Sequence, residues 1–245
     1  MVSYIKTTVA AAATLLCMGA AQAGVIQHVI NFEQPNSSPF ALSLPFLTHG
    51  DQFYQSGFAI DTLSNAAAPV AGDLVGALID GSDPGTCAVF QCPTNNTTNY
   101  YANLDDGLIS LFTLSGLNFT VDGFDAAFMG DPTGLNAGVP GRVIFQGVNA
   151  LTGAQQGFAF NLGANGQFSA FAPSAASALR NTAWRQMFIF GQTCNAAGSC
   201  SSFNSNRAQF GIDNLRLNVI PEPTSLALVA AAFVGLGVAR RRRQA

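Results

Sequence analysis

Lysine is almost absent from this chain: Lys6 is the single lysine, and charged residues make up only 9% of the 245 positions. Between residues 24 and 219 the positive charge comes from arginines alone, at Arg142, Arg180, Arg185, Arg207 and Arg216. Phosphate binding requires clustered lysine and arginine, so this composition argues against a nucleic-acid partner. A glycine-rich phosphate loop with its lysine is excluded for the same reason.

Histidine and glutamate are also scarce, which limits the candidates for catalysis. His28 lies within a strand pattern, and His49 lies in a polar loop. No G-x-S-x-G nucleophile elbow accompanies His49, and Glu33 is the only glutamate before residue 220, so no carboxylate pair stands out for glycoside hydrolysis. We therefore predict that the protein is not an enzyme. A secreted hydrolase that uses His49 as a base is an alternative.

The first 23 residues have the three parts of a secretory signal peptide. Lys6 supplies the positive charge, Val9–Met18 is the apolar segment, and Ala21-Gln22-Ala23 is an A-x-A cleavage site. We expect export through the Sec pathway and cleavage after Ala23. The ectodomain would then span residues 24–219, which is long enough for one domain with a buried core.

Residues 220–245 form a second targeting segment. Pro221-Glu222-Pro223 precedes the uncharged apolar run Thr224–Ala239, and four arginines follow, Arg240, Arg241, Arg242 and Arg243. As a helix the apolar run would be about 24 Å long, slightly short of a ~30 Å hydrocarbon core, so we expect a single transmembrane helix in the inner membrane. The arginines keep their end cytoplasmic, and the ectodomain lies outside.

This order of parts resembles the PEP-CTERM sorting signal of Gram-negative bacteria. The resemblance implies that an exosortase, a membrane-embedded cysteine protease or transpeptidase, removes the tail near Pro221-Glu222-Pro223. The ectodomain would then be released or attached at the surface of a bacterium that makes extracellular polysaccharide. The expected function is that of a non-enzymatic surface or matrix protein in a biofilm or floc.

The four cysteines of the ectodomain occur as two closely spaced pairs. Cys87 and Cys92 have C-x4-C spacing, and Cys194 and Cys200 have C-x5-C spacing. An even number of cysteines in an exported chain predicts disulfides, and the short spacing favours the local pairs Cys87–Cys92 and Cys194–Cys200. A zinc site, the alternative, would require tighter C-x2-C spacing and a reducing compartment.

Short segments of alternating polarity, separated by glycine, proline and asparagine, predict an all-β ectodomain. Leu117, Phe119 and Val121 alternate with polar residues, as in a half-buried strand. The predicted strands are Gly24–Glu33, Ser56–Leu63, Asn99–Leu104, Leu108–Leu114, Leu117–Asp122, Arg142–Val148, Gln156–Leu162, Trp184–Phe190 and Gln209–Val219. Only Pro173–Asn181 is a helical candidate. This pattern predicts an antiparallel β-sandwich or jelly roll.

Two turns predict hairpins within this fold. Asp105-Asp106-Gly107 separates the strands expected at Asn99–Leu104 and Leu108–Leu114. The loop Asn149–Gln155 separates the next pair of predicted strands. We expect each pair to lie side by side, with the many phenylalanines and Trp184 filling the space between two sheets.

Three segments are similar to exported PEP-CTERM proteins with a jelly-roll ectodomain: Ile30–Glu33, Tyr54–Phe58 and Phe210–Asn214. Gln209-Phe210-x-x-Asp213 looks like the closing motif of one group of them. In jelly rolls of this kind the first and last strands lie close together, and a structural calcium can bridge them. The resemblance supports the fold and makes Glu33 and Asp213 the candidate calcium ligands.

The alternative to calcium is that Asp213 and Asn214 hold a turn by hydrogen bonds of their own side chains. No stretch of the chain matches the D-x-D-x-D-G spacing of an EF-hand loop. The remaining loop acids would then be solvated.

Tyr100 and Tyr101 are the best candidates for sugar binding. An exposed tyrosine ring stacks on a pyranose ring, and the neighbouring amides of Asn99 and Asn103 suit sugar hydroxyls. A carbohydrate-binding module for extracellular polysaccharide is therefore the alternative function. In the competing interpretation one tyrosine points inward and the other covers a sheet face.

Overall fold

The structure is a computed structural model that describes residues 25–33, 46–83, 85, 92–104, 107–203 and 207–221. Residues Gln27–Val219 form one compact unit. The predicted signal peptide, the run Thr224–Ala239 and the four terminal arginines lie outside the described residues. In the part of the chain that is described, no helix is both long and apolar enough to span a membrane.

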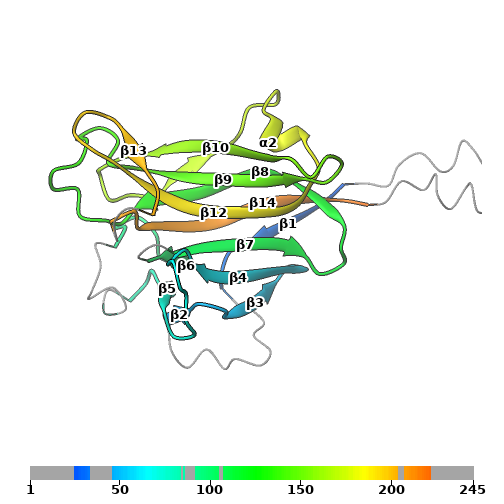
Figure 1. Cartoon of the computed structure of the whole chain (residues 1–245), viewed down its shortest axis with the longest axis horizontal. Helices are drawn as coiled ribbons and strands as arrows, with labels where there is room; N and C mark the ends of the chain where they lie inside the picture. The colour runs from blue at the N-terminus through cyan, green and yellow to red at the C-terminus, as the bar shows by residue number, and fades with distance from the viewer. Residues whose placement is uncertain are drawn as a thin grey trace, which may run out of the picture. The chain divides into compact units, whose positions relative to one another are not determined.

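The compact unit is all-β, as predicted, and its described residues include a short helix, α2 (Ala178–Asn181). Figure 1 shows how the strands are arranged. Their bounds are β1 (Ile26–Ile30), β2 (Phe46–Thr48), β3 (Gln52–Gln55), β4 (Phe58–Ser64), β5 (Leu74–Asp80), β6 (Asn99–Asn103), β7 (Gly107–Thr113), β8 (Asn118–Phe128), β9 (Gly141–Asn149), β10 (Gln155–Leu162), β11 (Ser169–Phe171), β12 (Trp184–Cys194), β13 (Cys200–Ser201) and β14 (Phe210–Ile220).

The strands make one curled sheet with two arms. The first arm has the order β2-β5-β6-β14-β8, with β1 on β14 and β11 on β8. The second has the order β10-β9-β12-β7-β4-β3, which can be followed down Figure 1. The arms join where Trp184 of β12 pairs with Phe119 of β8. Side chains from both arms form a single apolar cluster, so the curl encloses the core.

Aromatic rings supply much of this core. Trp184 is fully buried, and its indole N–H donates to the carbonyl of Leu179 at 2.9 Å, which satisfies its one polar group. Its ring meets Phe158 edge-on, with 5.7 Å between centroids. Gly147 lies directly beneath the indole, because a Cβ at this position would come within 2.4 Å of a ring carbon. Glycine is therefore required there for β9 to pass under the tryptophan.

One predicted hairpin is confirmed and the other is wrong. β9 and β10 pair antiparallel, with Gln155 opposite Val148. β6 and β7 follow one another in sequence but do not pair: β6 lies between β5 and β14, and β7 lies between β4 and β12. The Leu104 N–H instead donates to the carbonyl of Val75 at 3.0 Å. The chain therefore crosses from the first arm to the second at this turn.

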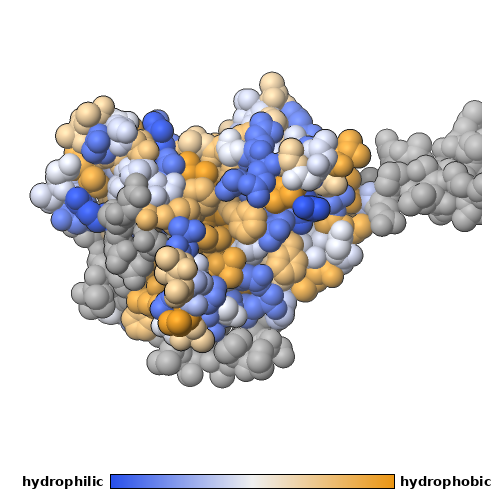
Figure 2. All heavy atoms as spheres, in the orientation of Figure 1, coloured by the Kyte–Doolittle hydropathy of each residue, from blue (hydrophilic) through white to orange (hydrophobic). Residues whose placement is uncertain are grey.

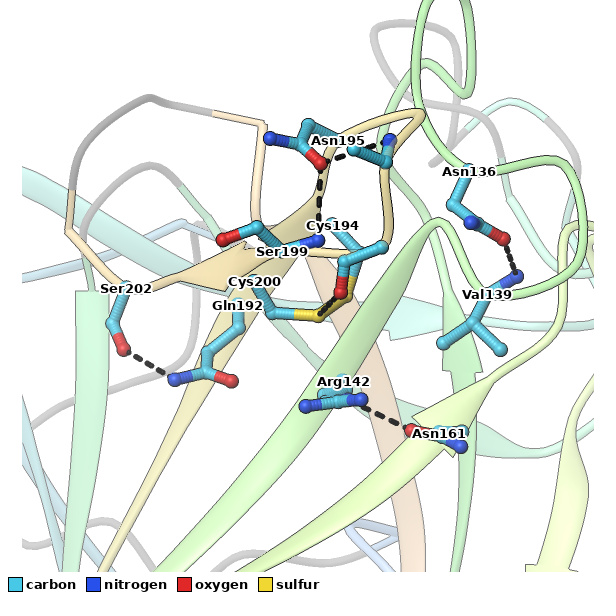
Figure 3. The surroundings of a disulfide bond; sticks show 12 residues. Asn136, Val139, Arg142, Asn161, Gln192, Cys194, Asn195, Ser199, Cys200 and Ser202 are labelled. Carbon is cyan, nitrogen blue, oxygen red and sulfur yellow. Dashed lines mark hydrogen bonds between the residues drawn. A yellow bond between two sulfur atoms is a disulfide. The ribbon is translucent and has the colours of Figure 1, made fainter.

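The predicted disulfide Cys194–Cys200 is present and closes the hairpin between β12 and β13 (Figure 3). Within its loop the side-chain oxygen of Asn195 accepts from the N–H groups of Ala197 and Ser199, at 3.1 and 3.0 Å. Cys92 is also disulfide-bonded. Its predicted partner, Cys87, lies outside the described residues.

Candidate functional site

A polar cavity of about 350 Å³ lies beside a break in the regular geometry of β14. Asn214 has a left-handed backbone, with φ 48°, in the middle of this strand. Consecutive side chains of a regular strand point to opposite faces, but Asp213 and Asn214 both line the cavity. We call it the polar cleft; it is lined by Asn95, Asn96, Thr97, Thr98, Asp125, Phe168, Ser169, Ala170, Asp213 and Asn214.

Asp213 is the buried centre of the polar cleft, with 1% of its surface exposed. Its Oδ2 accepts from the Asn96 amide at 3.0 Å and from the Thr98 hydroxyl at 3.1 Å. Its Oδ1 accepts from the backbone N–H of Asn214 at 2.7 Å. Burial raises the pKa of Asp213, and the nearby carboxylate of Asp125 raises it further, while these hydrogen bonds act in the opposite direction.

The side-chain amide of Asn214 links the two acids of the cleft. Its Nδ2 lies 2.9 Å from Oδ2 of Asp125 and 3.4 Å from Oδ2 of Asp213. Arg216 Nη1 lies 3.6 Å from the other oxygen of Asp125. The two carboxylates, on β8 and β14, are thus joined by one side-chain amide, that of Asn214.

The asparagines opposite these acids are also engaged by the protein. Asn95 accepts from the backbone N–H of Phe168 at 2.7 Å and donates to its carbonyl at 3.0 Å, as a paired strand would. Asn96 accepts from the N–H and the hydroxyl of Thr98, at 2.7 and 2.6 Å. The polar cleft is therefore a network whose members mainly bind one another and hold the loop before β6 against β14.

Glu33 and Asp213, the two predicted calcium ligands, accept hydrogen bonds from two consecutive residues, Asn99 and Thr98. Glu33 accepts from the backbone N–H of Asn99 at 3.0 Å, next to the Thr98 hydroxyl that binds Asp213. Among the described residues, no group of 3 or more His, Cys, Asp or Glu could hold a metal. Both carboxylates accept hydrogen bonds from N–H groups, as in a hydrogen-bonded turn. A calcium ion would need these oxygens as its own ligands. Calcium at this position stays a prediction.

Tyr100 and Tyr101 do not offer a sugar-binding surface, because both side chains are fully buried. Tyr101 stacks on Phe53 in the main core at 6.5 Å, and Tyr100 meets Phe168 edge-on at 5.1 Å on the opposite face of β6. Burial raises the pKa of both phenols. The prediction of a stacking platform here is wrong, since both faces of β6 are covered.

A second cavity, of about 330 Å³, lies on the outer face of the second arm. Phe188 of β12 pairs with Ser110 of β7 and Gln146 of β9, and Phe190 pairs with Leu108 and Ile144 of the same two strands, so the two side chains follow one another along β12 on one face of the sheet. In the orientation of Figure 1, apolar surface gathers over the middle of these strands, with polar surface around it (Figure 2). We call this cavity the aromatic groove; it is lined by His49, Leu63, Ser64, Asn65, Leu108, Gln146, Gln155, Phe188, Phe190 and Phe203.

Phe203 forms one wall of the aromatic groove. Its ring lies 5.0 Å from that of Phe190, at an interplanar angle of 32°. Its backbone has φ 55°, a left-handed conformation that is strained for a bulky residue. Gln192, whose amide donates to the Ser202 hydroxyl at 3.0 Å, helps to fix this segment after the disulfide-closed hairpin (Figure 3).

The rim of the groove is polar, and none of the described residues that line it is acidic, a lysine or an arginine. The Gln146 amide donates to the side-chain carbonyl of Gln155 at 3.0 Å. His49 Nδ1 accepts from the backbone N–H of Ser64 at 3.0 Å, which assigns the proton of the neutral ring to Nε2. Because Nδ1 accepts from the backbone of Ser64 and not from its hydroxyl, it is not placed as a base that activates that hydroxyl.

The sequence contained a signal for the groove that was overlooked when the phenylalanines were predicted to fill the space between two sheets. In the segment Trp184–Phe190, alternate residues Met187 and Ile189 are buried inside, which leaves Phe188 and Phe190 on the other face. Large apolar residues on both faces of one strand indicate that the outer face also has a role.

Comparison with known proteins gives little beyond this geometry. No family model matches the chain, and no curated protein matches it. Among solved structures it is similar to a DUF4465 family protein from Bacteroides ovatus, with a TM-score of 0.41 and 9% identity, over 79% of this chain and 99% of that one. So distant a likeness assigns neither a site nor a function.

Proposed function

We propose that this protein is exported, is processed by an exosortase at its PEP motif, and acts as a non-enzymatic component of the cell surface or of the extracellular polysaccharide matrix. The observation that carries the proposal is the join between domain and tail: β14 ends at Ile220, directly before Pro221. The disulfide Cys194–Cys200 agrees with an oxidising compartment outside the cytoplasm.

The location follows from the two ends of the sequence. The signal peptide directs the chain to the Sec pathway, and Thr224–Ala239 anchors it in the inner membrane until the exosortase acts. We further propose that the curled sheet is a sandwich of the jelly-roll kind, a rigid domain that can stand outside the cell. A structural calcium ion is not required by this proposal.

The test is to follow the C-terminus of the full chain in cells with and without an exosortase. With the enzyme, mass spectrometry is expected to find a C-terminus near residues 221–223 and the protein at the cell surface. Without it, or with Glu222→Ala and both flanking prolines replaced, the tail should remain and the protein should stay in the membrane fraction. Full-length protein at the surface in both strains would refute processing.

A second candidate function, binding of extracellular polysaccharide, is favoured by the aromatic groove. It is compatible with the first, because a matrix protein needs a contact with the matrix. It moves the predicted sugar site from Tyr100 and Tyr101 to the outer face of the second arm.

A further inference from the structure

We propose that the aromatic groove binds an uncharged polysaccharide chain, an inference that deepens the proposed matrix function and depends on it for its biological meaning. Phe188 and Phe190 are half-buried on the outer face of β12, while the core of the unit is filled by residues on its inner face. Their ring faces can stack on the apolar faces of pyranose rings.

Phe203 supports this assignment because a bulky residue is held in an unfavourable backbone conformation at the edge of the groove. A left-handed φ raises the free energy of the folded state. In this conformation the ring of Phe203 contacts the ring of Phe190. The disulfide-closed hairpin and the bond from Gln192 to Ser202 lie just before it in the chain. A wall held in this way is rigid before any ligand arrives, which lowers the entropic cost of binding.

The polar groups around the rings suit hydroxyls and not charges. Gln146 and Gln155 use one N–H and one carbonyl on each other, and an amide pair has further donors and acceptors for sugar hydroxyls. Asn65 and the Nε2–H of His49 add to them. In the part of the chain that the structure describes, His49 is the one lining residue that can carry a charge, so the groove offers little to a uronic acid, a phosphate or a metal ion.

An apolar occupant fits less well than a sugar. A helix such as the run Thr224–Ala239, or a second copy of this face, would cover the amides of Gln146 and Gln155 without bonding to them. The volume of about 330 Å³ lies at the lower end of the range for small-ligand sites, which suits a few sugar units of a chain.

The experiment is titration calorimetry of the full chain in a polyoxyethylene detergent, which has no sugar headgroup. The probes are hydroxyethyl cellulose, dextran and galactomannan as neutral polysaccharides, and polygalacturonate as an anionic one. We expect at least one neutral polysaccharide to bind and polygalacturonate not to bind. Phe188→Ala and Phe188→Leu should each weaken binding about tenfold, since both remove an aromatic face.

Phe112→Ala is the matched control. Phe112 lies on the same strand as Ser110 and on the same outer face, but it does not line the groove. Its loss should leave binding unchanged. The fluorescence of Trp184, which is fully buried, reports whether each variant is folded. Gln155→Ala, at an exposed position, tests the amides if Phe188→Ala fails to fold.

The proposal is overturned if no neutral polysaccharide binds, if polygalacturonate binds equally well, or if Phe188→Leu and Gln155→Ala both bind as the wild type does. Self-association that Phe188→Leu abolishes would show that a second copy fills the groove, which also overturns it. All these variants retain the PEP motif. Normal C-terminal cleavage together with lost sugar binding therefore separates failure of this proposal from failure of the proposed sorting.

Discussion

The polar cleft and the aromatic groove are of similar volume, but their polar side chains are used differently. In the cleft, Asp213 receives donors from Asn96, Thr98 and Asn214, and Asn95 is bound to the backbone of Phe168. In the groove, the side-chain amides of Gln146 and Gln155 share one hydrogen bond and lie beside the aromatic rings. A cavity whose polar groups satisfy one another stabilises the fold, whereas one with aromatic faces and spare amide capacity is suited to a ligand.

The largest expected effect lies in the cleft. Asp213→Ala leaves the Asn96 amide and the Asn214 N–H without this acceptor, while the Thr98 hydroxyl keeps its bond to Asn96. We expect the change to lower the free energy of unfolding by about 3 kcal/mol at neutral pH. Urea unfolding monitored by Trp184 fluorescence measures it. Asp125→Ala, at a more exposed acid, is the control and should cost less. Equal small losses in both variants would contradict the view of Asp213 as the centre of the network.

The pH dependence of the Asp213 contribution has a definite sign. Burial raises the pKa of Asp213 above the ordinary value of 3.8, so the folded state holds the proton more tightly than the unfolded chain does. The free energy of unfolding therefore falls as the pH rises from the unfolded pKa through the higher folded pKa. The stability difference between wild type and Asp213→Ala should be largest at the acidic end of this range. A difference that grows with pH would mean that the hydrogen bonds outweigh burial.

A smaller effect is expected from opening the disulfide that precedes the groove. Replacing Cys194 and Cys200 by serine removes the constraint on a short loop, and we expect a loss of about 2 kcal/mol in the free energy of unfolding. Because Phe203 follows this hairpin, binding in the groove should weaken too, while the contribution of Asp213 to stability stays the same. A double-mutant cycle with Asp213→Ala tests that independence.

Phe203→Gly should separate the role of the groove from the stability of the fold. Glycine adopts the left-handed backbone at φ 55° without strain, which offsets the lost ring contact with Phe190, so stability should change by less than about 1 kcal/mol. Sugar binding should nevertheless fall, because one wall of the groove is removed. A large loss of stability would show that Phe203 belongs to the core after all.

The smallest effect is expected from removal of calcium. The oxygens of Glu33 and Asp213 accept from the Asn99 N–H and from the Asn96 amide, so a calcium ion at this position would add little to stability, and EDTA should lower the melting temperature only slightly. A fall in the melting temperature that added calcium reverses, and that Glu33→Gln abolishes, would confirm the predicted calcium site. Magnesium serves as the control for a non-specific effect of divalent ions.

Much of the local structure could be predicted from the sequence, because it depends on neighbours along the chain. The alternation of Leu117, Phe119 and Val121 predicted part of β8, and the loop Asn149–Gln155 predicted that β9 and β10 form a hairpin. The spacing of Cys194 and Cys200 likewise predicted a bond between residues that are close in any conformation of the loop.

Other features could not be read from the same patterns, because they depend on which strands become neighbours. The turn before Gly107 looks like a hairpin, yet β7 pairs with β4 and β12 across a long sequence separation. Tyr100 and Tyr101 stand in a polar stretch that suits a surface, yet contacts with Phe168 and Phe53 bury both. Register and turn signals do not specify these long-range partners.

Composition and short-range pattern were thus enough to predict most of the strands, the export route proposed for the chain and the disulfide Cys194–Cys200, but not the strands β2, β3, β5, β11 and β13. Which faces of the strands remain open depends on the tertiary structure. Phe188 and Tyr101 are both aromatic residues of β-strands, but the curl of the sheet buries the second and leaves the first half-exposed beside Gln146. Exposure is a property of the whole packing, because a side chain is buried only when a distant part of the chain covers it.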